Sequence, residues 1–100
     1  MKNKNINKNI NKKTFRQLER IIKGGANHRR LGIMELLKKE PELSVIEIAK
    51  ELKVNAKTIA MHTRRLAISG LILKRNDFRF VRHKLTKNGE LMLSFSRMLE

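Results

Sequence analysis

Apolar residues recur at helical spacing shortly after the start of the chain. Thr14, followed three residues later by Gln17, has the pattern of a capping box, in which each side chain accepts a hydrogen bond from the other residue's backbone N–H. The spacing predicts a helix over residues 14–23, ended by the pair Gly24-Gly25. Its apolar stripe consists of Phe15, Leu18, Ile21 and Ile22.

A second and more apolar segment lies between Asn27 and Pro41. Asn27 is a favourable N-cap residue, and Pro41 cannot continue a helix. Because the apolar residues between them recur on one broad face, we expect a helix that is largely buried. These residues are Leu31, Ile33, Met34, Leu36 and Leu37.

Two shorter helices with a turn between them are predicted next. Ser44 and Glu47 form another capping box, and residues 53–55 read as the turn. Asn55 caps the following helix, predicted over residues 56–69 and ended by Gly70. The residues expected to point inward are Val45, Ile48, Ala49 and Leu52 in the first helix, then Ile59, Leu66 and either His62 or Thr63 in the second.

The last third of the chain changes from helical to strand periodicity and back. Residues 71–73 and 78–85 are predicted as two strands joined by a turn at Asn76-Asp77, and Thr86 caps a final helix over residues 87–99. The fold class is therefore mainly α with a small β-hairpin wing. Because the final helix has more apolar residues than a small core needs, we expect the terminal helices to form a homodimer contact. The residues concerned are Phe15, Leu18, Ile22, Leu91, Met92, Phe95, Met98 and Leu99.

Charge is large and unevenly distributed. The 100 residues include 24 Lys and Arg against 9 Asp and Glu, which gives a formal net charge of +15. Residues 1–30 and 55–100 carry the positive charge, whereas residues 31–54 are nearly neutral. Residues 1–13, rich in Lys and Asn, have too few apolar residues to order a backbone and are predicted to be a disordered basic arm, whose role remains open between DNA encounter and solubility. A polyanionic partner is expected.

The order of the predicted elements indicates which polyanion. An α-helix fits the major groove of B-form DNA, and a basic hairpin can lie along the neighbouring backbone. On the second helix of the pair, the residues that fall away from the apolar stripe are Asn55, Lys57, Thr58, Met61, Arg64 and Arg65. The predicted wing presents Lys74, Arg75, Asn76, Arg79, Arg82 and Lys84. This arrangement predicts binding to double-stranded DNA and a role as a transcriptional regulator.

Residues 30–89 resemble the winged helix-turn-helix domain of the ArsR (arsenic-resistance repressor) family. The resemblance rests on three motifs in order, which are R-L-x-I-M-x-L-L from residue 30, L-S-V-x-E-I-A-x-x-L-x-V from residue 43, and T-x-x-x-H-x-x-x-L-x-x-x-G-L-I from residue 58. Leu85-Thr86-x-x-Gly89 is similar to the exit from the family's wing. The resemblance implies a dimer in which Asn55, Ala56, Lys57, Thr58, Met61, His62 and Arg64 face the major groove. Lys57, Thr63 and Arg65 depart from the common pattern, which leaves the degree of sequence specificity open.

Metal, cofactor and catalytic chemistry are not expected. The chain has no cysteine, its three histidines (His28, His62 and His83) fall in separate predicted elements, and no nucleophile is paired with a base. It has neither a signal-peptide pattern nor a long apolar run, so we expect no membrane insertion and a cytoplasmic, nucleoid-associated location if the source is bacterial or archaeal. Two alternatives stay open. They are a winged-helix module that docks a protein, and a non-specific binder of nucleic acid, RNA included.

Overall fold

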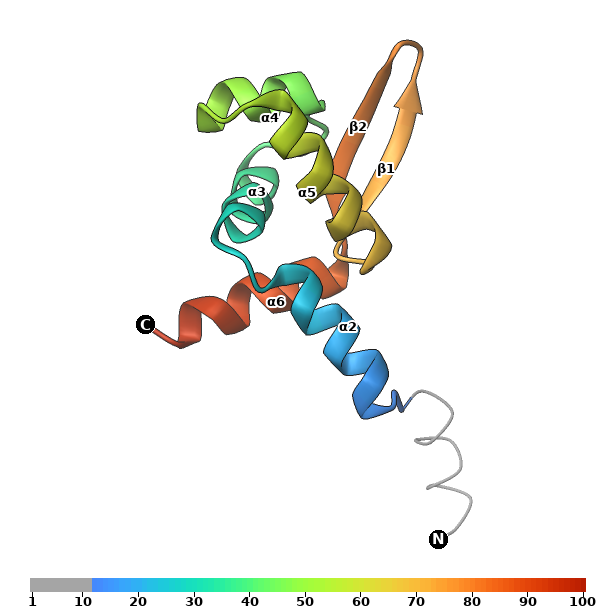
Figure 1. Cartoon of the computed structure of the whole chain (residues 1–100), viewed down its shortest axis with the longest axis vertical. Helices are drawn as coiled ribbons and strands as arrows, with labels where there is room; N and C mark the ends of the chain where they lie inside the picture. The colour runs from blue at the N-terminus through green and yellow to red at the C-terminus, as the bar shows by residue number, and fades with distance from the viewer. Residues whose placement is uncertain (1–11) are drawn as a thin grey trace, which may run out of the picture.

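The computed structural model describes residues 12–100, so most of the predicted arm over residues 1–13 lies outside the described residues. The order of elements is three helices, a fourth that follows a short turn, a hairpin and a final helix (Figure 1). Their bounds are α2 Phe15–Gly25, α3 His28–Lys39, α4 Val45–Leu52, α5 Ala56–Ile68, β1 Ile72–Asp77, β2 Phe80–Leu85 and α6 Lys87–Met98. The strands are antiparallel and form one two-stranded sheet.

Side-chain caps begin the helices where the sequence predicted them. Thr14 with Gln17, and Ser44 with Glu47, each form both hydrogen bonds of a capping box at the starts of α2 and α4. The other helices begin after a single side-chain cap, provided by Asn27 for α3, Asn55 for α5 and Thr86 for α6. These caps satisfy backbone N–H groups that have no partner inside the helix. The predicted starts of all five helices are thus confirmed.

The core is built around α3 and is closed by the other elements. Its fully buried side chains come from α3 and α4 (Ile33, Met34, Leu37 and Ile48), from α5 (Ile59 and Leu66), and from the start of the hairpin (Leu71 and Ile72). His62 and Thr63 of α5 are both buried, whereas the sequence pattern predicted that either one or the other would point inward. The Thr63 hydroxyl donates to the Ala60 carbonyl at 3.0 Å, which satisfies it inside its own helix.

The first helix ends at the glycine pair, as predicted, but it includes the pair and so runs to Gly25 instead of residue 23. Gly24 and Gly25 form the last turn of α2, and Ala26 is the C-cap. Both glycines are buried because α2 passes very close to its neighbours there. A Cβ on Gly25 would lie 2.9 Å from the Met92 side chain, and a Cβ on Gly24 would lie closer still to Ser69. The glycines therefore permit close packing in the turn at which the helix ends.

The turn of the hairpin is also displaced from its predicted place. Asn76 and Asp77 lie within β1, paired with Val81 and Phe80, so the turn consists of Phe78 and Arg79. Phe78 has φ of 56°, in the left-handed region that a bulky side chain rarely adopts. Local preference of Asn and Asp for turns is overridden because contacts at the base of the hairpin set the register.

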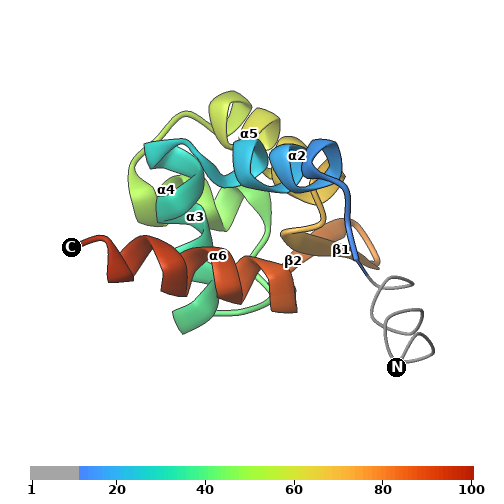
Figure 2. The ribbon, with the colours of Figure 1, turned by 90° about the horizontal axis from the view of Figure 1, so that it is seen from below.

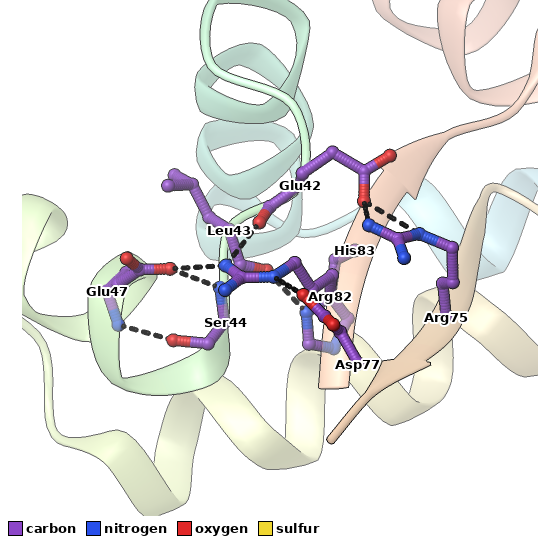
Figure 3. Close-up of polar contacts among 8 residues, drawn as sticks. All are labelled: Glu42, Leu43, Ser44, Glu47, Arg75, Asp77, Arg82 and His83. Carbon is purple, nitrogen blue, oxygen red and sulfur yellow. Dashed lines mark hydrogen bonds and ion pairs between the residues drawn. The ribbon is translucent and has the colours of Figure 1, made fainter. Parts of the chain in front are cut away.

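That base is joined to the loop between α3 and α4. His83 of β2 exchanges backbone hydrogen bonds with this loop, donating to the Leu43 carbonyl at 3.0 Å and accepting from the Glu42 N–H at 2.8 Å (Figure 3). The buried imidazole of His83 adds a third contact, with Nδ1 2.8 Å from the Leu43 carbonyl oxygen. Burial lowers the pKa of His83, and the bond to Leu43 opposes this in part.

Within residues 12–100, no helix is long and apolar enough to cross a membrane.

Candidate nucleic-acid interface

Helix α5 has two chemically different faces. Ile59, His62, Thr63 and Leu66 are buried against the rest of the fold. The opposite face exposes Lys57, Met61, Arg64 and Arg65, and the helix contains no acidic residue. An exposed basic helix face of this kind matches the predicted recognition helix in position and charge.

The start of α5 is fixed by its cap. The Asn55 Oδ1 accepts a hydrogen bond from the Lys57 N–H at 2.7 Å, so this side chain is held at the helix end. Ala56 and Thr58 are half-buried, and Lys57 is exposed. The positive end of the helix dipole and the Lys57 ammonium together favour an anion at this end.

His62 does not share the exposed face on which the family resemblance placed it. Its side chain is 6% exposed, and Nδ1 lies 3.1 Å from Nη1 of Arg30 at the start of α3. Burial lowers the pKa of His62, and the nearby Arg30 lowers it further. The imidazole is therefore a packing residue between α5 and α3, and we no longer assign it a DNA contact.

Two of the predicted wing cations are engaged within the protein. Arg82 donates from Nε to Asp77 at 3.0 Å and from Nη1 to the Glu42 carbonyl at 3.1 Å, and it lies 3.5 Å from the carboxylate of Glu47 (Figure 3). Arg75 donates to Glu42 at 2.8 Å. These contacts join the wing to the α4 capping box and the loop before it. Of the wing residues predicted to contact DNA, the exposed cations without an ion pair among residues 12–100 are Lys74, Arg79 and Lys84. The uncharged Asn76 is also exposed.

The structure also brings basic residues to α5 that sequence reasoning missed. Arg20 and Lys23 of α2, with Arg30 of α3, line a groove whose other wall is formed by Arg64 and Arg65. Figure 2 shows α2 and α5 side by side in this region. More than thirty residues separate the two walls in sequence, so periodicity carried no signal of the contact.

An apolar surface lies away from α5, between α2 and α6. Leu18, Ile22, Leu91 and Phe95 are each at least 39% exposed, and together with Ile21 and Met92 they line a shallow groove. Phe15 in α2 and Met98 and Leu99 at the end of α6 do not line this groove but are between 72% and 90% exposed. Seven of the eight residues predicted for dimer contact thus lie on the two terminal helices, and the eighth, Leu99, is the C-cap of α6. All of them except Met92 are exposed large apolar side chains.

In the part of the chain that the structure describes, no three His, Asp or Glu side chains converge on one point. His62 and His83 are buried in different places and His28 is exposed. Each of the two buried imidazoles has a protein partner, Arg30 in one case and Leu43 in the other.

Known proteins share this geometry. Residues 27–72 match the family described as winged helix-turn-helix DNA-binding. HlyU from Vibrio cholerae is 27% identical over 88% of this chain and 96% of its own, with a TM-score of 0.74. FabT from Streptococcus pneumoniae, solved in complex with DNA, is 25% identical over 69% of this chain and 50% of its own, with a TM-score of 0.63.

A third solved structure has the same fold. Mb0332 from Mycobacterium bovis is described as a homodimeric winged helix-turn-helix DNA-binding domain and a possible ArsR-family transcriptional regulator. It is 24% identical over 85% of this chain and 79% of its own, with a TM-score of 0.76. No curated protein sequence matches the chain.

The fold and the family match define a winged helix-turn-helix DNA-binding domain. The predicted fold class and the predicted DNA-binding function are confirmed. The chain is similar to winged helix-turn-helix transcription regulators, among them Mb0332, which is described as a possible ArsR-family regulator.

Proposed function

We propose that the protein is a homodimeric transcriptional regulator that places α5 in the major groove of double-stranded DNA. The observation that carries this proposal is the division of α5 into a buried apolar face and an exposed basic one. A helix is the element that the major groove admits, and its exposed side chains are then the ones that reach bases and phosphates. A cytoplasmic location, at the nucleoid in a bacterium or archaeon, follows from this role.

The two halves of α5 have different tasks in this proposal. Asn55, Ala56, Lys57 and Thr58 lie at the helix N-terminus, where backbone amides and the Lys57 ammonium hold a phosphate and short side chains approach base edges. Met61 lies one turn further along and offers an apolar contact to a thymine methyl group. Arg64 and Arg65 supply charge from the second half. Contacts between these cations and the phosphates of the DNA backbone therefore provide most of the affinity.

The wing contacts the DNA beside α5. Lys74, Arg79 and Lys84 are the hairpin cations that form no ion pair with residues 12–100, and Asn76 of β1 is also exposed. Because the minor groove is about 6 Å wide, a two-stranded ribbon does not enter it, but side chains at the tip do. Arg79 at the turn is the residue placed to reach that groove, where negative potential is strongest in A·T-rich sequence.

The homodimer is proposed from the apolar surface of α2 and α6. Phe95 is 55% exposed and Leu91 58% exposed, on a helix whose inner side already packs Leu93 into the fold. A monomer that left this surface in water would carry an apolar patch typical of protein contacts. Mb0332, which has the same fold, is described as homodimeric. Two copies related by a twofold axis would place their α5 helices on half-sites about one DNA turn apart.

The decisive experiment is binding of the full chain to a labelled random duplex across a salt series. We expect saturable binding with a steep decrease of affinity with salt, and weaker competition by duplex RNA and single-stranded DNA. The double variant Arg64→Ala with Arg65→Ala should reduce the slope of log affinity against log salt by about one to two. The control is Lys38→Ala with Lys39→Ala at the end of α3, which removes the same charge away from α5.

Two results would contradict the proposal. Absence of duplex binding at low salt would favour the protein-docking alternative. Equal competition by every polyanion, with the same slope for both double variants, would reduce the interaction to net charge and would remove α5 from the interface.

A further inference from the structure

A groove of about 500 Å³ lies between α2, the start of α3 and the second half of α5. Of its nine lining residues, all within the described part of the chain, five are cationic and none is acidic. The cations are Arg20, Lys23, Arg30, Arg64 and Arg65. Its volume is in the range of clefts that hold small ligands.

The fold builds this groove through one close contact and one arginine. Gly24 lets the end of α2 approach Ser69, since a Cβ at this position would lie 1.9 Å from the Ser69 hydroxyl oxygen. Arg30 then joins the walls, donating from Nε to the Gly24 carbonyl at 2.6 Å and contacting His62 of α5 through Nη1. The position of the cations is thus set by packing and not by flexible surface side chains alone.

The charge in the groove is largely uncompensated. Lys23 is paired with Glu19 at 3.3 Å, in an exposed contact of the kind that water screens strongly. Arg20, Arg64 and Arg65 form no ion pair with any residue of the described chain. Burial lowers the pKa of Arg30, and the nearby Arg65 lowers it further, as expected where like charges gather.

We propose that this groove binds a phosphate group, held by Arg20 from α2 and by Arg64 and Arg65 from α5. Guanidinium groups match phosphate oxygens in geometry as well as charge, and arginine accounts for four of the five cations. The phosphate has two possible sources. One is the DNA backbone, a source that rests on the proposed function, and the other is a free phosphorylated small molecule.

Either source couples the groove to DNA binding because Arg64 and Arg65 belong to the helix proposed to enter the major groove. A backbone phosphate in the groove extends the interface from α5 to α2, a helix otherwise assigned to dimer contact. A free phosphate ligand instead occupies these arginines and competes with DNA. The two sources therefore have opposite effects on duplex affinity.

The test uses the variant Arg20→Ala with Arg16→Ala as its matched control. Both arginines are exposed on α2 and lie one turn apart, but Arg16 does not line the groove. Full-length ¹⁵N-labelled protein is titrated with pyrophosphate at constant ionic strength, and the amide resonances of Gly24 and Ser69 are followed. Duplex affinity is measured for the same proteins across a salt series, with and without pyrophosphate.

Two outcomes support the proposal. For a free ligand, pyrophosphate saturates the resonance shifts, lowers duplex affinity, and binds about tenfold more weakly to Arg20→Ala. For the DNA backbone, pyrophosphate has little effect, while Arg20→Ala reduces the salt slope by about one and Arg16→Ala does not.

The proposal is overturned if Arg20→Ala and Arg16→Ala behave alike in both assays. Saturable pyrophosphate binding by a protein that binds no duplex would refute the proposed function but would still support phosphate binding in the groove. Duplex binding that Arg20→Ala and Arg16→Ala affect equally would support the proposed function and refute phosphate binding in the groove. The two proposals can therefore fail separately.

Discussion

Gly24 in α2 and Ser69 at the end of α5 approach so closely that a Cβ on Gly24 would lie 2.3 Å from the Ser69 Cβ. The methyl group of an alanine has no room there unless the backbone moves. We therefore predict that Gly24→Ala lowers the free energy of unfolding by about 1–3 kcal/mol, despite the higher helix propensity of alanine.

Gly32 provides the control for this prediction. It lies in the middle of α3, and a Cβ built on it meets no atom within 4 Å. Gly32→Ala should raise the free energy of unfolding by about 0.5–1 kcal/mol because it reduces the freedom of the unfolded chain. Urea denaturation measures both values, and equal effects of the two substitutions would show that the close contact is absent.

Replacing Arg82 should affect stability, whereas replacing Arg79 should affect DNA binding, although both are wing arginines. Arg82→Ala removes hydrogen bonds to Asp77 and the Glu42 carbonyl, and we expect a loss of about 1–2 kcal/mol of stability with little change in the salt slope of DNA binding. Arg79→Ala should leave stability unchanged and reduce the slope by about one. Thermal unfolding and salt-dependent anisotropy separate the two roles, and a slope change for Arg82→Ala would make it a phosphate contact after all.

The conformation of Phe78 predicts a stabilising substitution. With φ of 56° at the hairpin turn, this residue bears a steric cost that glycine does not have. Phe78→Gly should therefore raise the free energy of unfolding by about 1 kcal/mol. Phe80→Gly, made within β2, should lower it, and a lower stability for both variants would argue against strain at the turn.

Disruption of the apolar surface should produce monomers. Leu91→Glu with Phe95→Glu places two charges on the exposed side of α6, where burial in a dimer would be unfavourable. We expect sedimentation to change from dimer to monomer at micromolar concentration. Ile46→Glu, an exposed apolar position on α4, is the control. A wild-type chain that sediments as a monomer would refute the dimer.

Acid should destabilise the fold through its buried histidines. Burial lowers the pKa of His83 below its ordinary value of 6.5, so the unfolded chain binds the proton first as the pH falls. The stability is fully present above pH 6.5 and decreases between that value and the lower pKa of the folded state. His62 contributes with the same sign, again because burial lowers its pKa.

Thermal unfolding between pH 7.5 and pH 5.5 tests this prediction. His83→Gln should flatten the profile because it removes a buried group that takes up a proton on unfolding. An unfolding temperature that does not change over this interval would show that neither buried histidine resists protonation.

Local signals in the sequence were sufficient for the helices. Thr14, Ser44 and Asn55 cap the helices they were expected to cap, because capping depends on residues no more than three positions apart. The exposed basic face of α5 followed equally from periodicity. These features need no knowledge of the tertiary structure.

Features set by distant contacts were missed. The turn lies at Phe78 and Arg79 because the strands pair from Ile72 with Leu85 up to Asp77 with Phe80, and at the base of this hairpin His83 contacts Leu43, forty residues away. Arg82 looked like a free cation because Glu42 and Glu47 are distant in sequence. The groove between Arg20 and Arg65 was invisible for the same reason.

The pairing of Leu43 with His83 has a consequence for self-association. A hairpin in isolation has two open edges, and an open edge is a template for another strand. At His83 the outer edge of β2 is occupied by the chain's own loop, so at this point only β1 presents free backbone groups. The exposed charge of Lys74 on β1 discourages strand addition there. The loop therefore protects the protein from edge-to-edge aggregation at the base of its wing.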